Sequence, residues 1–151
     1  SGVLLFAKNE KLKNILQENW NEIATRLYYA VVIGKTKEKE VLKSYLKEND
    51  KLVTYQDKEG KLAITEYKRI KYNNDYSLLE IYIKTGRRNQ IRVQLKEINH
   101  PIAGDAKYGY KDKSIKRMML HASKLTIKNP SNGKTMTFTS SVDNYFYKLV
   151  E

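Results

Sequence analysis

Three of the six arginines in this chain, Arg87, Arg88 and Arg92, lie within six positions. They follow a Thr-Gly pair, whereas lysine supplies most of the positive charge in the rest of the sequence. Arginine differs from lysine because its planar guanidinium can bind a carboxylate or a phosphate through two parallel hydrogen bonds. This local concentration of arginine therefore indicates a site that binds an oxyanion.

The segment 88–99 that carries two of these arginines fits both a strand and a helix. Apolar residues at 91, 93 and 95 alternate as in a strand, whereas those at 91, 95 and 98 recur at helical spacing. On the helical interpretation Arg88, Arg92 and Lys96 share one face. We favour the helix because this charged face is continuous and because Asn99, just before His-Pro, is a typical helix end. A helix that begins beside Arg87 and Arg88 would suit a phosphate.

The charge of the whole chain favours a polyanionic partner. It has 29 basic and 17 acidic residues, a net charge of +12. Such a surplus is typical of proteins that bind nucleic acid or an anionic membrane surface, although a lysine-rich composition alone would also produce it. The 12 tyrosines add ring faces on which unpaired bases can stack.

Composition also limits the other kinds of site. Cysteine is absent and only two histidines are present, which excludes disulfides and thiolate metal sites and argues against a structural zinc. The sequence has no phosphate-binding loop and no dinucleotide fingerprint, so we expect neither a metal nor a cofactor. It also has no apolar run long enough for a membrane span.

Hydrophobic patterning predicts the α+β class, with a mixed, largely antiparallel sheet and a few flanking helices, in a single domain over residues 1–151. The apolar run Val3–Ala7 predicts an interior strand, and Asn9 can cap a helix that runs to about residue 20. Further strands are expected at 27–33, 41–46 and 52–55, in hairpins at 62–72/76–85 and 120–128/134–140, and a short helix from Ser141 or Asp143 to Leu149 closes the chain.

Several motifs resemble the RluA-type pseudouridine synthase family. The segments GRRNQIRVQL and HPIAGDAKYG are similar to that family's Gly-Arg-Thr-His-Gln-(Ile/Leu)-Arg segment and its His-Pro-(Ile/Leu)-x-Gly-Asp-x-x-Tyr-Gly loop. RLYYAVV at 26–32, GKLAIT at 60–65 and LHA at 120–122 match further family motifs in the same order, and Asn129-Pro130 with Gly133 fits the turn that follows. The resemblance covers roughly the whole chain.

The resemblance implies an enzyme that flips a uridine out of the RNA stack and isomerises it to its C-glycoside without a cofactor. It implies that Arg92 pairs with a catalytic aspartate and that Tyr28 stacks on the flipped uracil and assists in proton steps. Ile91 would form part of the apolar wall of the base pocket. A further set would lie at the mouth of that pocket: Gln90, Arg87 and Arg88. Both histidines are expected to be structural.

The chain departs from the family pattern at two places. The family's Thr-His before Gln is Arg88-Asn89 here, which could alter contacts with RNA. The family's nucleophile lies in His-Arg-Leu-Asp-x-x-Thr-Ser-Gly, and Ser1-Gly2 matches only the end of that motif. None of the chain's own aspartates occupies the motif. We therefore expect the C-terminal part of a catalytic domain, inactive alone, in which Arg92 lacks the carboxylate it should hold.

Two functional classes follow. The first is a pseudouridine synthase acting on rRNA or tRNA, implied by the resemblance to be a cytoplasmic monomer, with Tyr28 and Arg92 meeting in one cleft. The alternative is a non-catalytic RNA-binding module, either a truncation or a degenerate paralogue. For Arg92 in particular, a partly buried structural ion pair with an Asp or Glu is the competing interpretation.

Overall fold

The computed structural model describes residues 1–110 and 114–151. In that part of the chain seven strands form one sheet in the order β3-β2-β4-β5-β1-β6-β7, and every neighbouring pair is antiparallel. The elements along the chain are α1 Glu10–Ile23, β1 Ala24–Ile33, β2 Lys39–Glu48, β3 Thr54–Gln56, β4 Lys61–Tyr72, β5 Tyr76–Ile83, α2 Gln90–Glu97, β6 Leu120–Lys128, β7 Thr135–Thr139 and α3 Asn144–Lys148. The expected α+β class is confirmed.

Both expected hairpins form. In the β4–β5 hairpin the side chain of Asn73 accepts hydrogen bonds from the amides of Asp75 and Tyr76 at 3.0 and 2.8 Å, which closes the turn. In the β6–β7 hairpin Gly133 has φ of +70°, a left-handed conformation that glycine adopts without strain. The sheet therefore gains two of its strand pairs from local turns.

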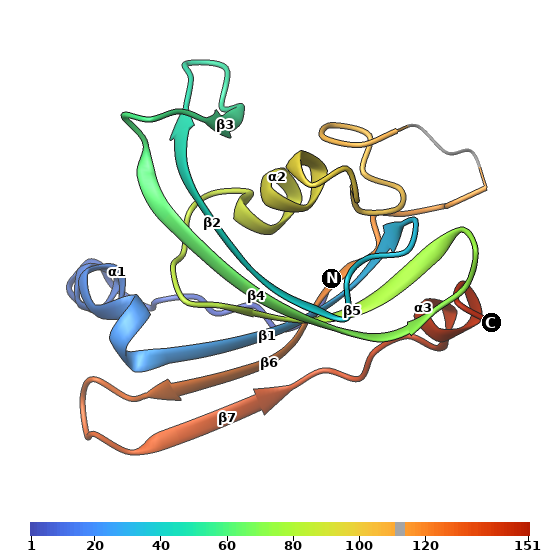
Figure 1. Ribbon diagram of the computed structural model, residues 1–151. Coiled ribbons are helices and arrows are strands. Elements are labelled where there is room, and N and C mark those ends of the chain that lie inside the picture. Colours follow the sequence, from blue (N-terminus) through green and yellow to red (C-terminus); the bar gives the residue numbers. More distant parts are fainter. Residues whose placement is uncertain (111–113) are drawn as a thin grey trace.

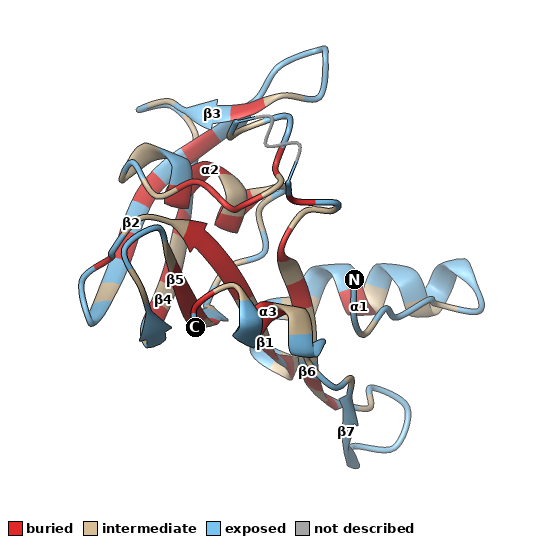
Figure 2. Ribbon diagram, turned by 90° about the vertical axis from the view of Figure 1, so that its right-hand side faces the viewer, coloured by how far each residue is buried: buried red, intermediate tan, exposed pale blue. Residues whose placement is uncertain are grey.

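The sheet curves around α2, which lies in its concave side (Figure 1). β2 alternates buried and exposed residues, and its buried Ser44 accepts a hydrogen bond from Nε2 of Gln94 at 2.9 Å. The same Gln94 nitrogen donates to the carbonyl of Ala63 on β4 at 3.1 Å. Apolar residues of α2 complete the core beneath it, and buried residues concentrate between α2 and the strands (Figure 2). The helical interpretation of this segment was correct.

The other two helices also begin at residues with capping side chains. Asn9 accepts a hydrogen bond from the amide of Leu12 at 2.9 Å, and α1 then runs to Ile23, somewhat further than expected. Asp143 accepts from the amide of Tyr145 at 2.9 Å and caps α3. Within α1 only Leu16 is buried, so this helix depends on few contacts with the sheet.

The predicted interior strand Val3–Ala7 is wrong. An isolated parallel bridge to Ala122 lies at Gly2, just before the segment, residues 3–7 form no strand, and Leu4 and Phe6 are 74% and 81% exposed. The physical reason is that both edges of β6 are already paired. β1 pairs along one edge of β6, and β7 pairs along the other edge from Lys124 onward. Only the start of β6 therefore offers the N-terminal segment a free edge.

Candidate functional site

A cavity of about 600 Å³ lies between α1, the segment after Gly2, the loop at 86–87 and the strands β1 and β6. Its lining residues come from segments that are distant in the sequence: Val3, Leu4, Leu5, Ala7, Lys13, Leu16, Gln17, Trp20, Asn21, Arg26, Tyr28, Ile83, Gly86, Arg87, Ala122, Lys124 and Leu125. The cavity thus combines apolar side chains, two aromatic side chains and four cations.

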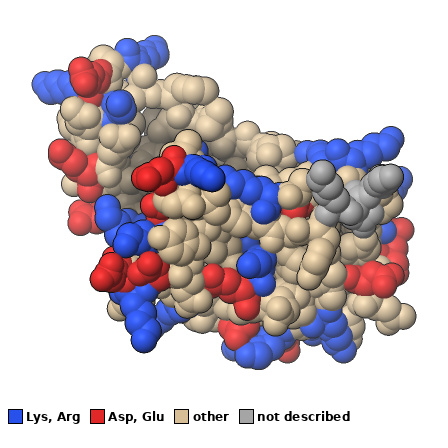
Figure 3. All heavy atoms as spheres, turned by 90° about the horizontal axis from the view of Figure 1, so that it is seen from above, with Lys and Arg blue, Asp and Glu red and all other residues tan. Residues whose placement is uncertain are grey.

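The cavity lining is more uniformly charged than the surface. Viewed from above, Lys and Arg alternate with Asp and Glu on the outside of the molecule (Figure 3). By contrast, the lining residues in the described ranges 1–110 and 114–151 include no Asp or Glu, and they include four cations: Lys13, Arg26, Arg87 and Lys124. Since like charges repel and nothing in this lining offsets them, the cavity favours an anionic ligand. Together with the rings of Trp20 and Tyr28, this lining suits a nucleotide.

Tyr28 lies on the interior strand β1, between Ala122 of β6 and Ile81 of β5. Burial raises the pKa of its phenol, and the positive charge of Arg26 acts in the opposite direction. The hydroxyl is therefore neutral around pH 7, and it can donate a hydrogen bond or a proton inside the cavity. The structure thus places the expected Tyr28 in a cavity, beside a base-sized space.

Arg26, two residues before Tyr28, also lines this cavity and was not among the predicted site residues. Arg26 is 6% exposed, and its Nη2 donates a hydrogen bond to Oδ1 of Asn21 at 3.0 Å. Its guanidinium lies 5.9 Å from the ring centre of Trp20. The sequence could have identified Arg26 as a site residue. It is the first residue of the RLYYAVV motif, and residues two apart on a strand, such as Arg26 and Tyr28, point to the same face.

Arg87 is placed at the cavity by Gln90, which is 2% exposed. Oε1 of Gln90 accepts from the amide of Arg87 at 3.1 Å and from the hydroxyl of Thr85 at 2.7 Å. Its Nε2 donates to the carbonyl of Ile64 at 3.0 Å and to the hydroxyl of Thr65 at 2.9 Å. Gln90 therefore does not face the cavity itself but fastens the arginine-bearing loop to β4.

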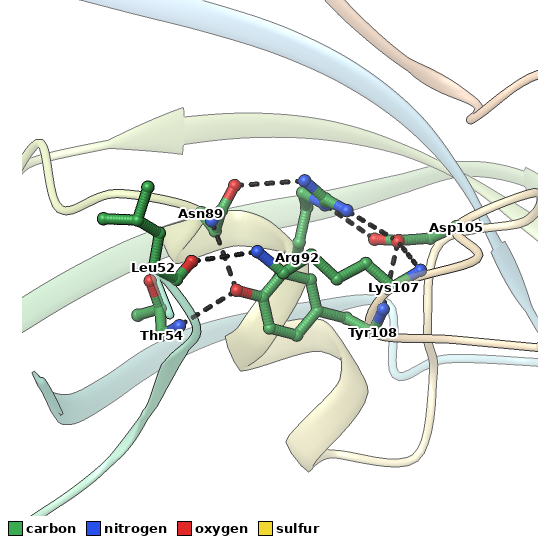
Figure 4. Close-up of polar contacts among 7 residues, drawn as sticks. All are labelled: Leu52, Thr54, Asn89, Arg92, Asp105, Lys107 and Tyr108. Carbon is green, nitrogen blue, oxygen red and sulfur yellow. Dashed lines mark hydrogen bonds and ion pairs between the residues drawn. The ribbon is translucent and has the colours of Figure 1, made fainter. Parts of the chain in front are cut away.

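Arg92 is not among the residues that line this cavity. The expected meeting of Arg92 and Tyr28 in one cleft therefore stays a prediction. Its guanidinium binds the carboxylate of Asp105 through Nε at 2.7 Å and Nη2 at 2.8 Å (Figure 4). Nη1 donates to Oδ1 of Asn89 at 3.0 Å, and the ring of Tyr108 lies 4.8 Å from the guanidinium carbon. The competing interpretation of Arg92, a partly buried ion pair with an Asp or Glu, is confirmed with Asp105 as the partner. The absence of the catalytic aspartate from the chain stays a prediction.

The ion pair stabilises the charged forms of both Arg92 and Asp105. Burial alone would raise the pKa of the Asp105 carboxyl, but hydrogen bonds from Arg92 and from the amides of Tyr108 and Lys107 outweigh burial and hold the pKa below its ordinary value. Conversely, the hydrogen bond to Asp105 raises the pKa of Arg92 despite burial. Asp105 is therefore a carboxylate at neutral pH, bound to one arginine and two amides.

The remaining predicted site residues lie elsewhere. Ile91 is 5% exposed and belongs to the hydrophobic core, so the apolar wall of the cavity near the sheet comes from Ile83 instead. Arg88 is exposed and its Nε lies 3.2 Å from a carboxylate oxygen of Glu48 on β2. Of the six predicted residues, the cavity therefore brings together Tyr28 and Arg87.

The side chains of the two histidines contact backbone carbonyl groups within the fold. His100 Nδ1 lies 2.8 Å from the carbonyl oxygen of Ile33, and His121 Nε2 lies 3.1 Å from that of Ser140. Among the residues that the structure describes, no three His, Asp or Glu side chains gather as a metal site would require. None of the helices in the same part of the chain is long and apolar enough to cross a membrane.

Comparison with known proteins identifies the family. Residues 1–97 match the family model described as RNA pseudouridylate synthase. The chain belongs to this family. Among its relatives, the chain is 30% identical to a tRNA pseudouridine synthase C of Haemophilus influenzae, over 99% of this chain and 73% of that protein. It is 38% identical to a ribosomal large subunit pseudouridine synthase D of Borreliella burgdorferi, over 84% of this chain and 41% of that protein.

The fold of this chain is also similar to solved structures of RNA pseudouridylate synthase domains. The human protein RNA pseudouridylate synthase domain containing 1 superposes with a TM-score of 0.74 at 22% identity, over 95% of this chain and 64% of that one. The chain spans about half the length of most of the relatives it matches, between 41% and 54% of four of them. The RluA-type resemblance is thus confirmed at the level of family and fold.

Proposed function

We propose that this chain forms the uridine-binding part of an RNA pseudouridine synthase. The observation that carries the proposal is the cavity at Tyr28, which has aromatic walls, four cations and, in the described ranges, no carboxylate. RNA supplies what complements this lining, namely flat bases that stack on its aromatic rings and negative charge that neutralises its cations. The family of the chain supplies the reaction, and rRNA and tRNA are the substrates named for its relatives.

In this proposal a target uridine leaves the base stack and enters the cavity. Unstacking costs a few kcal/mol, and stacking on Tyr28 offsets part of that cost, because base–aromatic stacking contributes about 1–3 kcal/mol per base. Ile83 contributes an apolar wall, and Arg87 contacts the RNA backbone at the mouth. Isomerisation then breaks the bond from N1 of uracil to the ribose, forms a bond from C5 to the same ribose carbon, and moves a proton from C5 to N1.

Arg92 has a second possible role in this proposal. A guanidinium has five N–H donors, and three nitrogen atoms of Arg92 each use one donor toward Asp105 or Asn89. Within residues 1–110 and 114–151, two N–H groups, one on Nη1 and one on Nη2, thus stay available for the carboxylate of a catalytic aspartate. Asp105 would hold the plane of the guanidinium while those two donors face the nucleophile.

The nucleophile itself is proposed to come from outside residues 1–151. Support comes from two observations: none of the chain's aspartates occupies the family's His-Arg-Leu-Asp motif, and no described Asp or Glu lines the cavity. The chain by itself is therefore expected to bind RNA without isomerising uridine. Base flipping and a cytoplasmic location belong to the same proposal.

The test is release of tritium from RNA that carries tritiated uracil at C5. The chain alone should release none above background, whereas the same chain joined to a preceding segment with the aspartate motif should release it. A matched variant of that longer protein, with the motif's aspartate replaced by asparagine, should be inactive. Release by the 151-residue chain alone would contradict the proposed source of the nucleophile.

A non-catalytic RNA-binding module is the second candidate. The carboxylate-free lining of the cavity in the described residues favours it as much as it favours an incomplete enzyme. The residues encoded directly before Ser1 in the parent reading frame decide between the two. A His-Arg-Leu-Asp motif there supports the enzyme, and a preceding sequence without an aspartate supports the binding module.

A further inference from the structure

Arg26 is a buried cation without a counter-ion in the described part of the chain. It is 6% exposed, and no described Asp or Glu forms an ion pair with it. Burial lowers its pKa, and the next largest influence comes from Tyr28 rather than from a carboxylate. A charge removed from water at a cost of several kcal/mol is normally paired.

The hydrogen bonds of Arg26 are also incomplete. Nη2 donates to the neutral side chain of Asn21, whereas Nε is buried without a partner among residues 1–110 and 114–151. Since Arg26 lines the cavity, a ligand that enters there can contact its guanidinium. The donors of a guanidinium edge match the oxygens of a phosphate or carboxylate.

The surroundings hold the guanidinium of Arg26 in place. A Cβ atom on Gly86 would lie 2.8 Å from Nη1 of Arg26, so the absence of a side chain at residue 86 lets the loop approach the guanidinium closely. Trp20 covers the guanidinium at 5.9 Å from its ring centre. The charge is therefore fixed in place, rather than free to move into solvent as an exposed lysine would be.

We propose that Arg26 binds one backbone phosphate of the RNA strand whose nucleotide occupies the cavity. The inference rests on the proposed function. It follows from charge: the bases and riboses of RNA are neutral, so the only groups in that ligand that can neutralise a buried guanidinium are its phosphates. A carbonyl of the base would accept a hydrogen bond from the guanidinium but leave the charge uncompensated.

The experiment measures affinity for single-stranded RNA oligonucleotides with one central uridine, by fluorescence anisotropy. One phosphate at a time is replaced by a neutral methylphosphonate, and each oligonucleotide is tested with the wild-type chain and with Arg26→Gln. In wild type, one particular replacement should weaken binding about tenfold, as expected for loss of a charge-assisted hydrogen bond. Arg26→Gln should bind unmodified RNA about tenfold more weakly and should be insensitive to that same replacement.

Two control variants separate this contact from general electrostatics. Lys43→Gln removes one positive charge from β2 beside Ser44, whose side chain points the other way toward α2, and it should retain the methylphosphonate effect in full. Arg26→Lys keeps the charge but not the paired donors, and it should recover part of the lost affinity. If Arg26→Gln binds like Lys43→Gln, or stays sensitive to every linkage, the inference is overturned.

Thermal unfolding without RNA provides an independent readout. Because Arg26 is buried without an ion-pair partner in the described part of the chain, Arg26→Met should leave the melting temperature unchanged or raise it, by about 2–4 °C. A melting temperature lowered by more than that would identify Arg26 as a structural residue and overturn the inference. If the wild-type chain does not bind RNA at all, the proposed function fails. If RNA binds but the Arg26 coupling is absent, only this inference fails.

Discussion

Arg92 and Asp105 form a two-point ion pair that joins α2 to the loop following it, with Nε–Oδ2 and Nη2–Oδ1 distances of 2.7 and 2.8 Å. The Asp105 side chain is 1% exposed and that of Arg92 is 19% exposed. The amides of Lys107 and Tyr108 also donate hydrogen bonds to Oδ1 of Asp105, at 3.0 and 3.1 Å. This pair fixes the loop 102–109 against α2, whatever further role Arg92 has.

Removing the charge of Asp105 should destabilise the fold. Asp105→Asn leaves the Arg92 guanidinium partly buried without its counter-charge, and such a loss costs about 3–5 kcal/mol. Urea unfolding measures it. The matched control is Asp143→Asn, which removes an exposed partner of Arg117 while asparagine still caps α3, and it should cost only about 0–1 kcal/mol. Equal losses in the two variants would contradict a structural role for the pair.

The same pair predicts the response to acid. Because the pKa of Asp105 is lower in the folded chain than in the unfolded chain, the stability it contributes is fully present above its ordinary pKa of about 4. That contribution is lost as the pH falls through the lower, folded pKa. The difference in unfolding free energy between wild type and Asp105→Asn should therefore be constant near neutral pH and shrink below about pH 4. A difference that grows on acidification would be inconsistent with a lowered pKa.

Arg92→Lys tests whether Arg92 acts beyond this pair. In a longer protein that carries the aspartate motif, lysine keeps the charge but not the second pair of donors. If Arg92 holds the nucleophile as proposed, Arg92→Lys should lose nearly all tritium release, whereas Asp105→Asn should keep measurable release under conditions where both remain folded. Parallel losses in activity and stability for both variants would leave Arg92 with a structural role alone.

Salt should weaken RNA binding by this chain. With at most four lining cations contacting phosphates, the slope of log affinity against log salt should be no steeper than about −3, since each neutralised phosphate of a single strand contributes about −0.7. Arg87→Gln should make the slope shallower by about 0.7, whereas Lys43→Gln should not change it. Affinity that is independent of salt would rule out the cationic lining as the RNA-binding surface.

The N-cap residue Asn9 should stabilise α1, the helix that forms one side of the cavity. Asn9→Ala removes the hydrogen bond to the amide of Leu12 and should cost about 1 kcal/mol. Because Leu16 is the only buried residue of α1, the loss should appear as faster amide exchange within this helix. Exchange in β1 and β5, read in the same experiment, should stay unchanged. Uniform acceleration throughout the sheet would mean that α1 unfolds only with the whole domain.

The parts of the fold that were predictable from sequence are those set by local chemistry. Alternation and turn residues defined both hairpins, and capping side chains at Asn9 and Asp143 marked two helix starts. The segment Val3–Ala7 failed because apolar composition alone does not say whether a sheet edge is free to receive a strand. That depends on β7, more than 100 residues later in the chain.

The site was predictable only in part, for the same reason. Motif resemblance pointed to Tyr28 and Arg87, which do line the cavity, but not to Trp20 or Lys13, which belong to the non-motif helix α1. The pairing of Arg92 with Asp105 also has no local signature, because 13 residues and a helix end separate the two. The arginine-rich segment therefore serves different purposes at each arginine: a cavity lining, a surface ion pair and a loop anchor.

The strand order has a consequence for the order in which the chain folds during synthesis. β1 is made early, yet its two hydrogen-bonded neighbours are β5 and β6, at residues 76–83 and 120–128. A ribosome that adds residues from the N-terminus must therefore release this interior strand long before either partner exists. Until then β1, with its run of buried apolar residues, is an unpaired strand of the kind that aggregates or recruits a chaperone. The interior position of β1, between two late partners, is thus also the reason that the nascent chain needs protection longest at this strand.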